Sequence, residues 1–153
     1  MATAKVIFPD ELAAKIAKLA ERTDEISEKA LKAGGEVVLG AAKRNLAAVI
    51  GKTKYSRSTG ELLSSLGLSP MKIDRDGNPN VRVGFNEPRR KQTAAKGKRS
   101  YHVATNAMIA NVIEYGRHGK QSPKPFMKPA QSSSKSTCKA AMIAAFEREI
   151  GNL

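Results

Sequence analysis

Residues 111–130, NVIEYGRHGKQSPKPFMKPA, bring the end of a helix, an irregular loop and a Pro-Phe-Met corner into one short stretch. The apolar spacing before the loop predicts a helix over 106–116 that ends at Gly116, because glycine commonly follows the last turn of a helix. Beyond the loop, Pro129 suits the first turn of a new helix, which is predicted over 129–150. The stretch therefore predicts a helix–loop–helix corner.

Two further helices are predicted before this corner, over 1–22 and 23–50. The first has apolar residues at the i, i+4, i+7 spacing of one helical face, and the second ends before Gly51. Gly34 and Gly35 weaken the second helix by about 1 kcal/mol each relative to alanine. This pair predicts either a bend or a close approach of another backbone. The apolar residues of the first helix are Leu12, Ile16 and Leu19.

A small antiparallel sheet is predicted over 62–105, with a basic loop over 87–100. Apolar residues alternate on both sides of the turn signal Asp-Gly-Asn-Pro at 76–79, which predicts a β-hairpin. Pro70 predicts an edge or a bulge in the first strand, since proline cannot donate to a strand ladder. The segment SYHVAT, 100–105, is expected to add a third strand. Helices at both ends around a small sheet indicate an α+β fold.

The length of 153 residues, with 41% apolar but only 5% aromatic residues, indicates one domain over 1–153 with an aliphatic core. No apolar stretch reaches the roughly twenty residues of a membrane span, and the N-terminus has no signal-type apolar region. We therefore expect a protein made in a cytoplasm, without a membrane partner. Cys138 is the only cysteine, so it can close no intramolecular disulfide and is too isolated for a zinc site.

The net charge of +13 is concentrated in the middle of the chain, where residues 51–128 carry 16 basic and 5 acidic side chains. The segment 89–99 is either a solvated loop or an electrostatic contact to nucleic acid or an acidic protein, and its composition leaves both open. Its basic residues are Arg89, Arg90, Lys91, Lys96, Lys98 and Arg99. The wider positive zone adds Lys52, Lys54, Arg57, Lys120, Lys124 and Lys128.

No catalytic constellation follows from the residue pattern. Gly51-Lys52-Thr53 resembles the end of a phosphate-binding loop, but Leu46 stands where the first glycine is required. His102 and His118 lie in different predicted elements, without the cysteines or carboxylates of a metal site. Glu114 at a helix end is interpreted as a structural carboxylate that accepts hydrogen bonds from a nearby loop. We therefore predict no enzyme activity, no cofactor and no metal.

Local motifs occur along the chain in a specific order. AAKRNLAAV, STGELLSSL and VRVGF are followed by NVIEYGRHG, KPFMKPA and a C-terminal helix. This order, over about 25–148, resembles the tail-completion or head-tail joining family of long-tailed bacteriophages and prophages. The most specific parts are Thr59-Gly60 followed by Leu62 and Ser65, and Glu114-Tyr115-Gly116 with the Pro-Phe-Met-Lys-Pro-Ala run that begins at Pro125.

The resemblance implies a non-enzymatic virion protein at the neck, made in the bacterial host cytoplasm. It would complete the tail or join it to the head connector, in contact with other neck, connector and tail proteins. It would assemble as a homo-oligomeric ring around the DNA path, with nonspecific DNA contact open. The alternative, from a different class, is a nonspecific nucleic-acid-binding protein that uses the loop 89–99.

Within such a protein, the corner at 111–130 would act as a structural clasp for the last helix. Gly116 would let the chain leave the preceding helix, and Phe126 and Met127 would insert between the two helices. Glu114 would bind loop amides, and Tyr115 would cover the apolar seam. Two prolines, Pro125 and Pro129, would stiffen the return of the chain.

Overall fold

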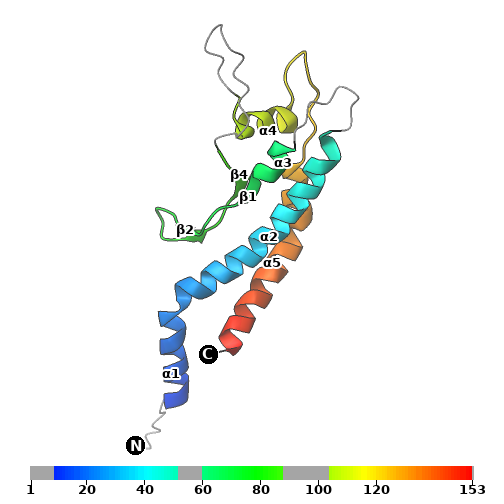
Figure 1. The fold of residues 1–153 in the computed structure, drawn as a ribbon. Coiled ribbons are helices and arrows are strands. Elements are labelled where there is room, and N and C mark those ends of the chain that lie inside the picture. Colours follow the sequence, from blue (N-terminus) through cyan, green and yellow to red (C-terminus); the bar gives the residue numbers. More distant parts are fainter. Residues whose placement is uncertain (1–8, 52–59, 88–103, 153) are drawn as a thin grey trace, which may run out of the picture.

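The computed structural model describes residues 9–51, 60–87 and 104–152, and its axis is a pair of long antiparallel helices (Figure 1). α2 (Thr23–Val49) and α5 (Met127–Gly151) lie along each other for most of their length. Small side chains allow this, because the distance between packed helices depends on the side chains at the contact. The small buried residues are Ala30, Gly34, Gly35, Ala41 and Ala42 on α2 and Ala130, Ser134 and Ala145 on α5.

α2 continues through Gly34 and Gly35 as one uninterrupted helix. A Cβ atom at Gly34 would collide with the side chain of Met142 on α5. A Cβ atom at Gly35 would lie 2.6 Å from Cδ1 of Leu68. The glycine pair therefore allows a close approach to α2, which was one of the two predicted outcomes. The groups that approach it are the side chains of Met142 and Leu68 rather than a backbone.

A β-hairpin packs beside α2, and its two halves form separate two-stranded antiparallel sheets. In the half nearer the helices, Leu66 lies opposite Phe85, and in the half nearer the turn, Ile73 lies opposite Pro79. Between the halves, residues 69–71 face only two residues of the other strand, which is the bulge expected at Pro70. The elements are α3 (Glu61–Ser65), β1 (Leu66–Leu68), β2 (Lys72–Ile73), β3 (Pro79–Asn80) and β4 (Val83–Phe85).

The hairpin turn is closed by Asp74. Its Oδ1 accepts hydrogen bonds from the backbone N–H groups of Asp76 at 3.0 Å and Asn78 at 2.8 Å. Gly77 supplies the positive φ of 81° that the turn requires. The predicted hairpin is thus confirmed, while Ile73 near its tip is exposed to solvent.

Two shorter helices flank the axis at opposite ends (Figure 1). α4 (Asn106–Tyr115) begins with two caps, since Thr105 Oγ1 accepts the N–H of Met108 and Glu87 Oε1 accepts that of Ala107. α1 (Asp10–Glu21) meets α2 at Arg22 and contains no buried residue. The predicted helix over 1–22 is therefore present from residue 10, and residues 1–8 lie outside the described part of the chain.

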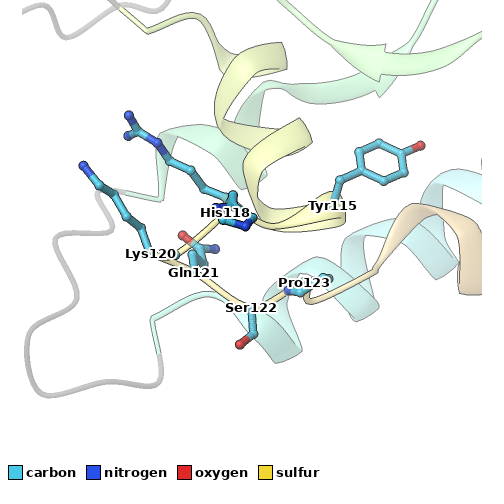
Figure 2. Close-up of a pocket in the computed structure, with 8 residues that line it drawn as sticks. Tyr115, His118, Lys120, Gln121, Ser122 and Pro123 are labelled. Carbon is cyan, nitrogen blue, oxygen red and sulfur yellow. The ribbon is translucent and has the colours of Figure 1, made fainter.

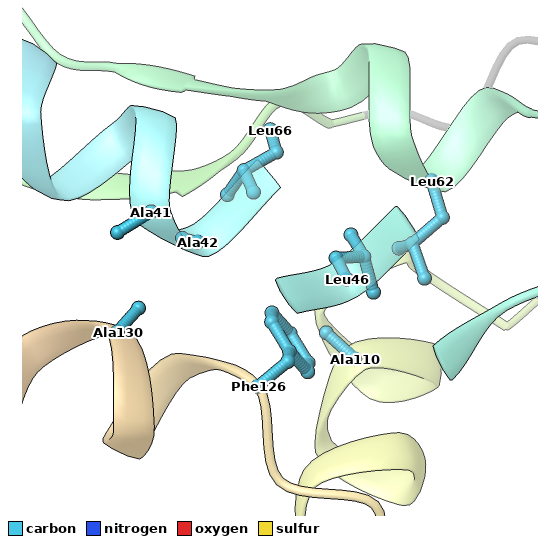
Figure 3. Close-up of a cluster of buried hydrophobic side chains, with 8 residues drawn as sticks. All are labelled: Ala41, Ala42, Leu46, Leu62, Leu66, Ala110, Phe126 and Ala130. Carbon is cyan, nitrogen blue, oxygen red and sulfur yellow. The ribbon is translucent and has the colours of Figure 1, made fainter. Parts of the chain in front are cut away.

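The core lies where α2, α3, α4, β1 and the start of α5 meet (Figure 3). It is aliphatic, as the composition predicts, with Phe126 as its largest fully buried side chain. The cluster consists of Ala41, Ala42, Leu46, Leu62, Leu66, Ala110, Phe126 and Ala130. Most of the core therefore gathers at one end of the long helix pair.

The α+β class is confirmed, but the predicted sheet over 62–105 is corrected at both ends. Residues 62–65 belong to α3, because Gly60 adopts a left-handed conformation with φ of 75° and the following turn buries Leu62. Residues 104 and 105 are not strand, since Thr105 caps α4 instead. The remainder of the expected third strand, 100–103, lies outside the described residues.

Candidate functional site

The carboxylate of Glu114 binds the start of α5. Its Oε2 accepts the backbone N–H groups of Phe126 at 2.7 Å and Met127 at 2.9 Å, and its Oε1 accepts that of Lys128 at 2.9 Å. These N–H groups belong to the first turn of a helix, where donors have no partner within the helix and negative charge is favoured. Glu114 on α4 therefore caps α5 from a distance of 12 to 14 residues along the chain. We call this arrangement the clasp.

Burial and hydrogen bonding act on Glu114 in opposite directions. Burial alone raises the pKa of the carboxyl group, but the three backbone N–H donors and the charge of Lys128 lower it by more. The pKa of Glu114 is therefore lowered from its ordinary value, and the group is ionised at neutral pH. Both oxygens are engaged with backbone donors, so this carboxylate is poorly placed to serve as a general base.

Phe126 fixes the clasp in the core. Its side chain is 1% exposed and packs edge-to-face on Phe85, with ring centroids 6.2 Å apart. Its carbonyl oxygen accepts a hydrogen bond from Asn45 Nδ2 on α2 at 3.1 Å. Figure 3 shows the ring beside Leu46 and Ala110, at the junction of α2, α4 and α5. One residue thus connects three helices and the sheet.

Gly116 is required by the geometry of the chain after α4. Its φ is 77°, a conformation that other residues rarely adopt. A Cβ atom there would lie 2.7 Å from the carbonyl oxygen of Gln121 and 2.9 Å from the nitrogen of Pro123. The chain returns close to α4, since Lys124 donates its backbone N–H to the carbonyl oxygen of Ile113 at 2.8 Å. Gly116 therefore occupies the position expected for it.

The two prolines flank the clasp. Pro125 is exposed and directly precedes Phe126, while Pro129 is the third residue of α5. A proline is tolerated in the first turn, where its missing N–H needs no partner. The predicted start of the last helix at Pro129 is corrected to Met127, because Glu114 satisfies the donors of the two residues before the proline.

The expectation for Tyr115 is wrong. Its side chain is 74% exposed and does not cover the apolar seam. Successive residues of a helix point about 100° apart, so the burial of Glu114 turns its neighbour outward. Figure 2 shows Tyr115 projecting from the end of α4, away from His118 and Lys120.

Four exposed basic side chains lie on the loop between α4 and α5 and on the first turn of α5. Lys120, Lys124 and Lys128, members of the predicted positive zone, are exposed, and so is Arg117, which that zone omitted. We call these four residues the basic rim. Arg117 and Gln121 hold the loop between α4 and α5 through two mutual backbone hydrogen bonds of 2.9 Å. This loop lies at the end of the molecule that holds most of the core (Figure 1).

Several predicted site residues lie outside the described ranges. These are Arg89, Arg90, Lys91, Lys96, Lys98 and Arg99 of the basic loop, Thr59 of the Thr-Gly pair, and Lys52, Lys54 and Arg57. Among the residues that the structure describes, no three His, Cys, Asp or Glu side chains are grouped to hold a metal ion. None of the described helices is long and apolar enough to cross a membrane.

An ion-pair cluster, which the sequence reasoning missed, joins the other ends of α2 and α5. Glu25 pairs with Arg22 at 3.0 Å and with Lys29 at 2.7 Å, and Lys29 also reaches Glu149 of α5 at 2.8 Å. The hydrogen bonds from Arg22 and Lys29 lower the pKa of Glu25 to about 2. The i, i+3 and i, i+4 spacing within α2 could have predicted two of these pairs, whereas the contact with Glu149 depends on the packing of the helices.

Comparison with known proteins places the chain among phage structural proteins. The family model described as "Bacteriophage HK97-gp10, putative tail-component" matches residues 10–116, from the start of α1 to the glycine after α4. The chain belongs to this family of bacteriophage tail components, and as a tail component it is a virion protein. The clasp acceptor Glu114 lies inside the match, whereas α5 lies beyond it. No curated protein and no solved structure significantly matches the chain.

Proposed function

We propose that this tail component acts at the head–tail junction, where it completes the tail and joins it to the head connector as a non-enzymatic structural part. The membership in a tail-component family carries the proposal. The clasp supports a structural role. Glu114 is the buried ionisable side chain among the described residues, and both of its carboxylate oxygens accept hydrogen bonds from backbone N–H groups at the start of α5. A helix pair that is already folded can bind its neighbours without the entropic cost of ordering on binding.

The basic rim is the surface that we assign to the neighbour at this junction. Arg117, Lys120, Lys124 and Lys128 lie on one loop and the adjoining helix turn, and the one acidic residue between 114 and 128, Glu114, is buried. In a ring, several copies of the rim would line one face and concentrate positive charge toward an acidic connector surface or toward DNA. Such a contact is electrostatic and independent of base sequence.

Electron microscopy of particles that carry a labelled copy of this protein tests the proposal. The expected position of the label is the head–tail junction, and deletion of the gene should leave DNA-filled heads together with free tails. Normal infectious particles from the deletion strain, or a label along the tail tube or at its tip, would overturn the proposal.

DNA binding by the isolated chain separates the proposal from the nonspecific nucleic-acid-binding alternative. That alternative requires tight binding whose affinity falls steeply with salt, with a slope of about 0.9 per phosphate contact. Binding should be lost when the basic residues of 89–99 are neutralised. The junction role instead expects weak binding by the free chain, because the charge acts only when several copies are assembled.

A further inference from the structure

α1 has an apolar face that the described residues of its own chain leave open. Leu12 is 45% exposed and Ile16 is 51% exposed, and the half-buried Leu19 completes the face one turn further along. α1 leaves α2 at Arg22 and projects beyond the C-terminal end of α5 (Figure 1). We call this helix the arm.

A second open apolar surface lies on the last two turns of α5. Ile143, Phe146 and Ile150 are 47%, 42% and 39% exposed, and they follow one another along one side of the helix. A shallow hollow beside them is lined in addition by Ala30, Met142, Glu147 and Gly151. We call these three residues of α5 the strip.

The arm and the strip match in length and pattern. Leu12, Ile16 and Leu19 occupy d, a and d positions of a heptad, while Ile143, Phe146 and Ile150 occupy a, d and a. In each set the first and last residues are seven positions apart, or about 10.5 Å along the helix. An antiparallel alignment therefore stacks three complete layers, which pair Leu12 with Ile150, Ile16 with Phe146 and Leu19 with Ile143.

The helix dipoles agree with this alignment. The antiparallel alignment places the positive end of one helix dipole beside the negative end of the other.

The chain cannot make this contact with itself. α2 and α5 are antiparallel, so an arm folded back over Arg22 would run antiparallel to α2 and hence parallel to α5 (Figure 1). Moreover, Arg22 is held by ion pairs to Glu25 at 3.0 Å and to Glu149 at 3.8 Å. The matched alignment therefore needs a strip on another molecule.

We propose that the arm of one copy docks antiparallel on the strip of a second copy, and that repetition of this contact builds the ring; this deepens the proposed function and rests on it. The two surfaces differ, so the contact is heterologous, and such contacts close into rings when the rotation allows. The arm is a short helix of 12 residues. Its contact falls below the roughly 800 Å² per partner of a standard interface. Each copy in a closed ring makes two such contacts, so the ring is favoured over a free dimer.

Disulfide trapping between two different chains tests the contact. Both chains carry Cys138→Ser; one adds Leu12→Cys and a size tag, and the other adds Ile150→Cys. Oxidation of the mixture should give a covalent heterodimer, because the paired Cα atoms would lie within about 7 Å. The matched control replaces Ile150→Cys by Ile143→Cys, about 10.5 Å further along the helix, and should give at least tenfold less heterodimer.

A second variant checks that the strip itself is responsible. Adding Phe146→Glu to the Ile150→Cys chain should abolish the heterodimer while the far-ultraviolet circular dichroism stays unchanged. The proposal is overturned by a mixture that yields no heterodimer, by equal yields from the two cysteine positions, or by a disulfide homodimer of Leu12→Cys chains that outcompetes the heterodimer. Labelling at the head–tail junction is read separately, so the ring contact and the proposed location can fail independently.

Discussion

The two ends of the helix pair use the same residue types in opposite ways. At the clasp, Phe126 is buried and Glu114 is saturated by backbone N–H groups. At the arm end, Phe146 is 42% exposed and Glu25 pairs with exposed side chains of Arg22 and Lys29. The clasp is completed within one chain, whereas the arm end presents apolar surface that the described residues of one chain do not cover.

This difference separates folding from assembly. A buried backbone donor without a partner costs free energy in the monomer, so the clasp has to be satisfied before the protein meets any neighbour. An open apolar strip costs little in a monomer, because exposed apolar atoms are common on protein surfaces. Substitutions at the clasp should therefore change the stability of the single chain, and substitutions at the arm end should change its association.

The largest effect is expected from a pair of phenylalanine substitutions. Phe126→Ala removes a fully buried ring from the core and should lower the free energy of unfolding by about 3–5 kcal/mol. Phe146→Ala, the same change at the strip, should cost about 1 kcal/mol or less in the dilute monomer. Urea unfolding followed by circular dichroism measures both. Equal losses for the two variants would contradict the distinction between the ends.

The clasp carboxylate should show the next largest effect. Glu114→Gln keeps the shape but removes the charge and presents an amide N–H₂ group to backbone donors, so it should cost about 2–4 kcal/mol. The control is Glu147→Gln on the exposed side of α5, which should change stability by about 0.5 kcal/mol or less. The urea midpoints of both variants at neutral pH are compared with that of the unchanged protein. A Glu114→Gln protein as stable as the control would show that the clasp contributes no net stability.

Lowering the pH should reduce the difference in unfolding free energy between the unchanged protein and Glu114→Gln. The folded pKa of Glu114 is lowered, so its contribution is fully present above the unfolded value of about 4.3 and is lost as the pH falls through the folded pKa. Glu25, whose folded pKa is also lowered, is present in both proteins and cancels in the difference. The measurement is the stability difference between the two proteins from about pH 7 to pH 3. A difference that stays constant or grows toward low pH would argue against an ionised clasp.

A substitution in the arm should have the smallest effect on the stability of the monomer. Ile16→Ala replaces a residue that is 51% exposed on a helix without buried residues, so unfolding of the dilute monomer should change by about 0.5 kcal/mol or less. The same variant should reduce association, which sedimentation at high protein concentration measures against the unchanged chain. A large loss of monomer stability would mean that the arm packs on its own body.

Local patterns predicted much of the fold. Helical periodicity located the four longer helices of the described residues, since it is set by neighbouring residues within two turns. The turn at 74–78 and the bulge at Pro70 follow equally from short-range chemistry. Sequence reasoning also placed Gly116 after a helix and interpreted Glu114 as an acceptor for loop amides.

The sequence by itself therefore determined the secondary-structure elements, the aliphatic character of the core and the positions where the chain must turn. Only the tertiary structure decided that Glu114 meets the first turn of α5, that this helix starts at Met127, and that Tyr115 faces solvent. It also decided which apolar faces stay open at the arm end. The physical reason is that these features depend on how α4, α5 and α2 are placed relative to one another, and that placement is set by contacts between residues far apart along the chain.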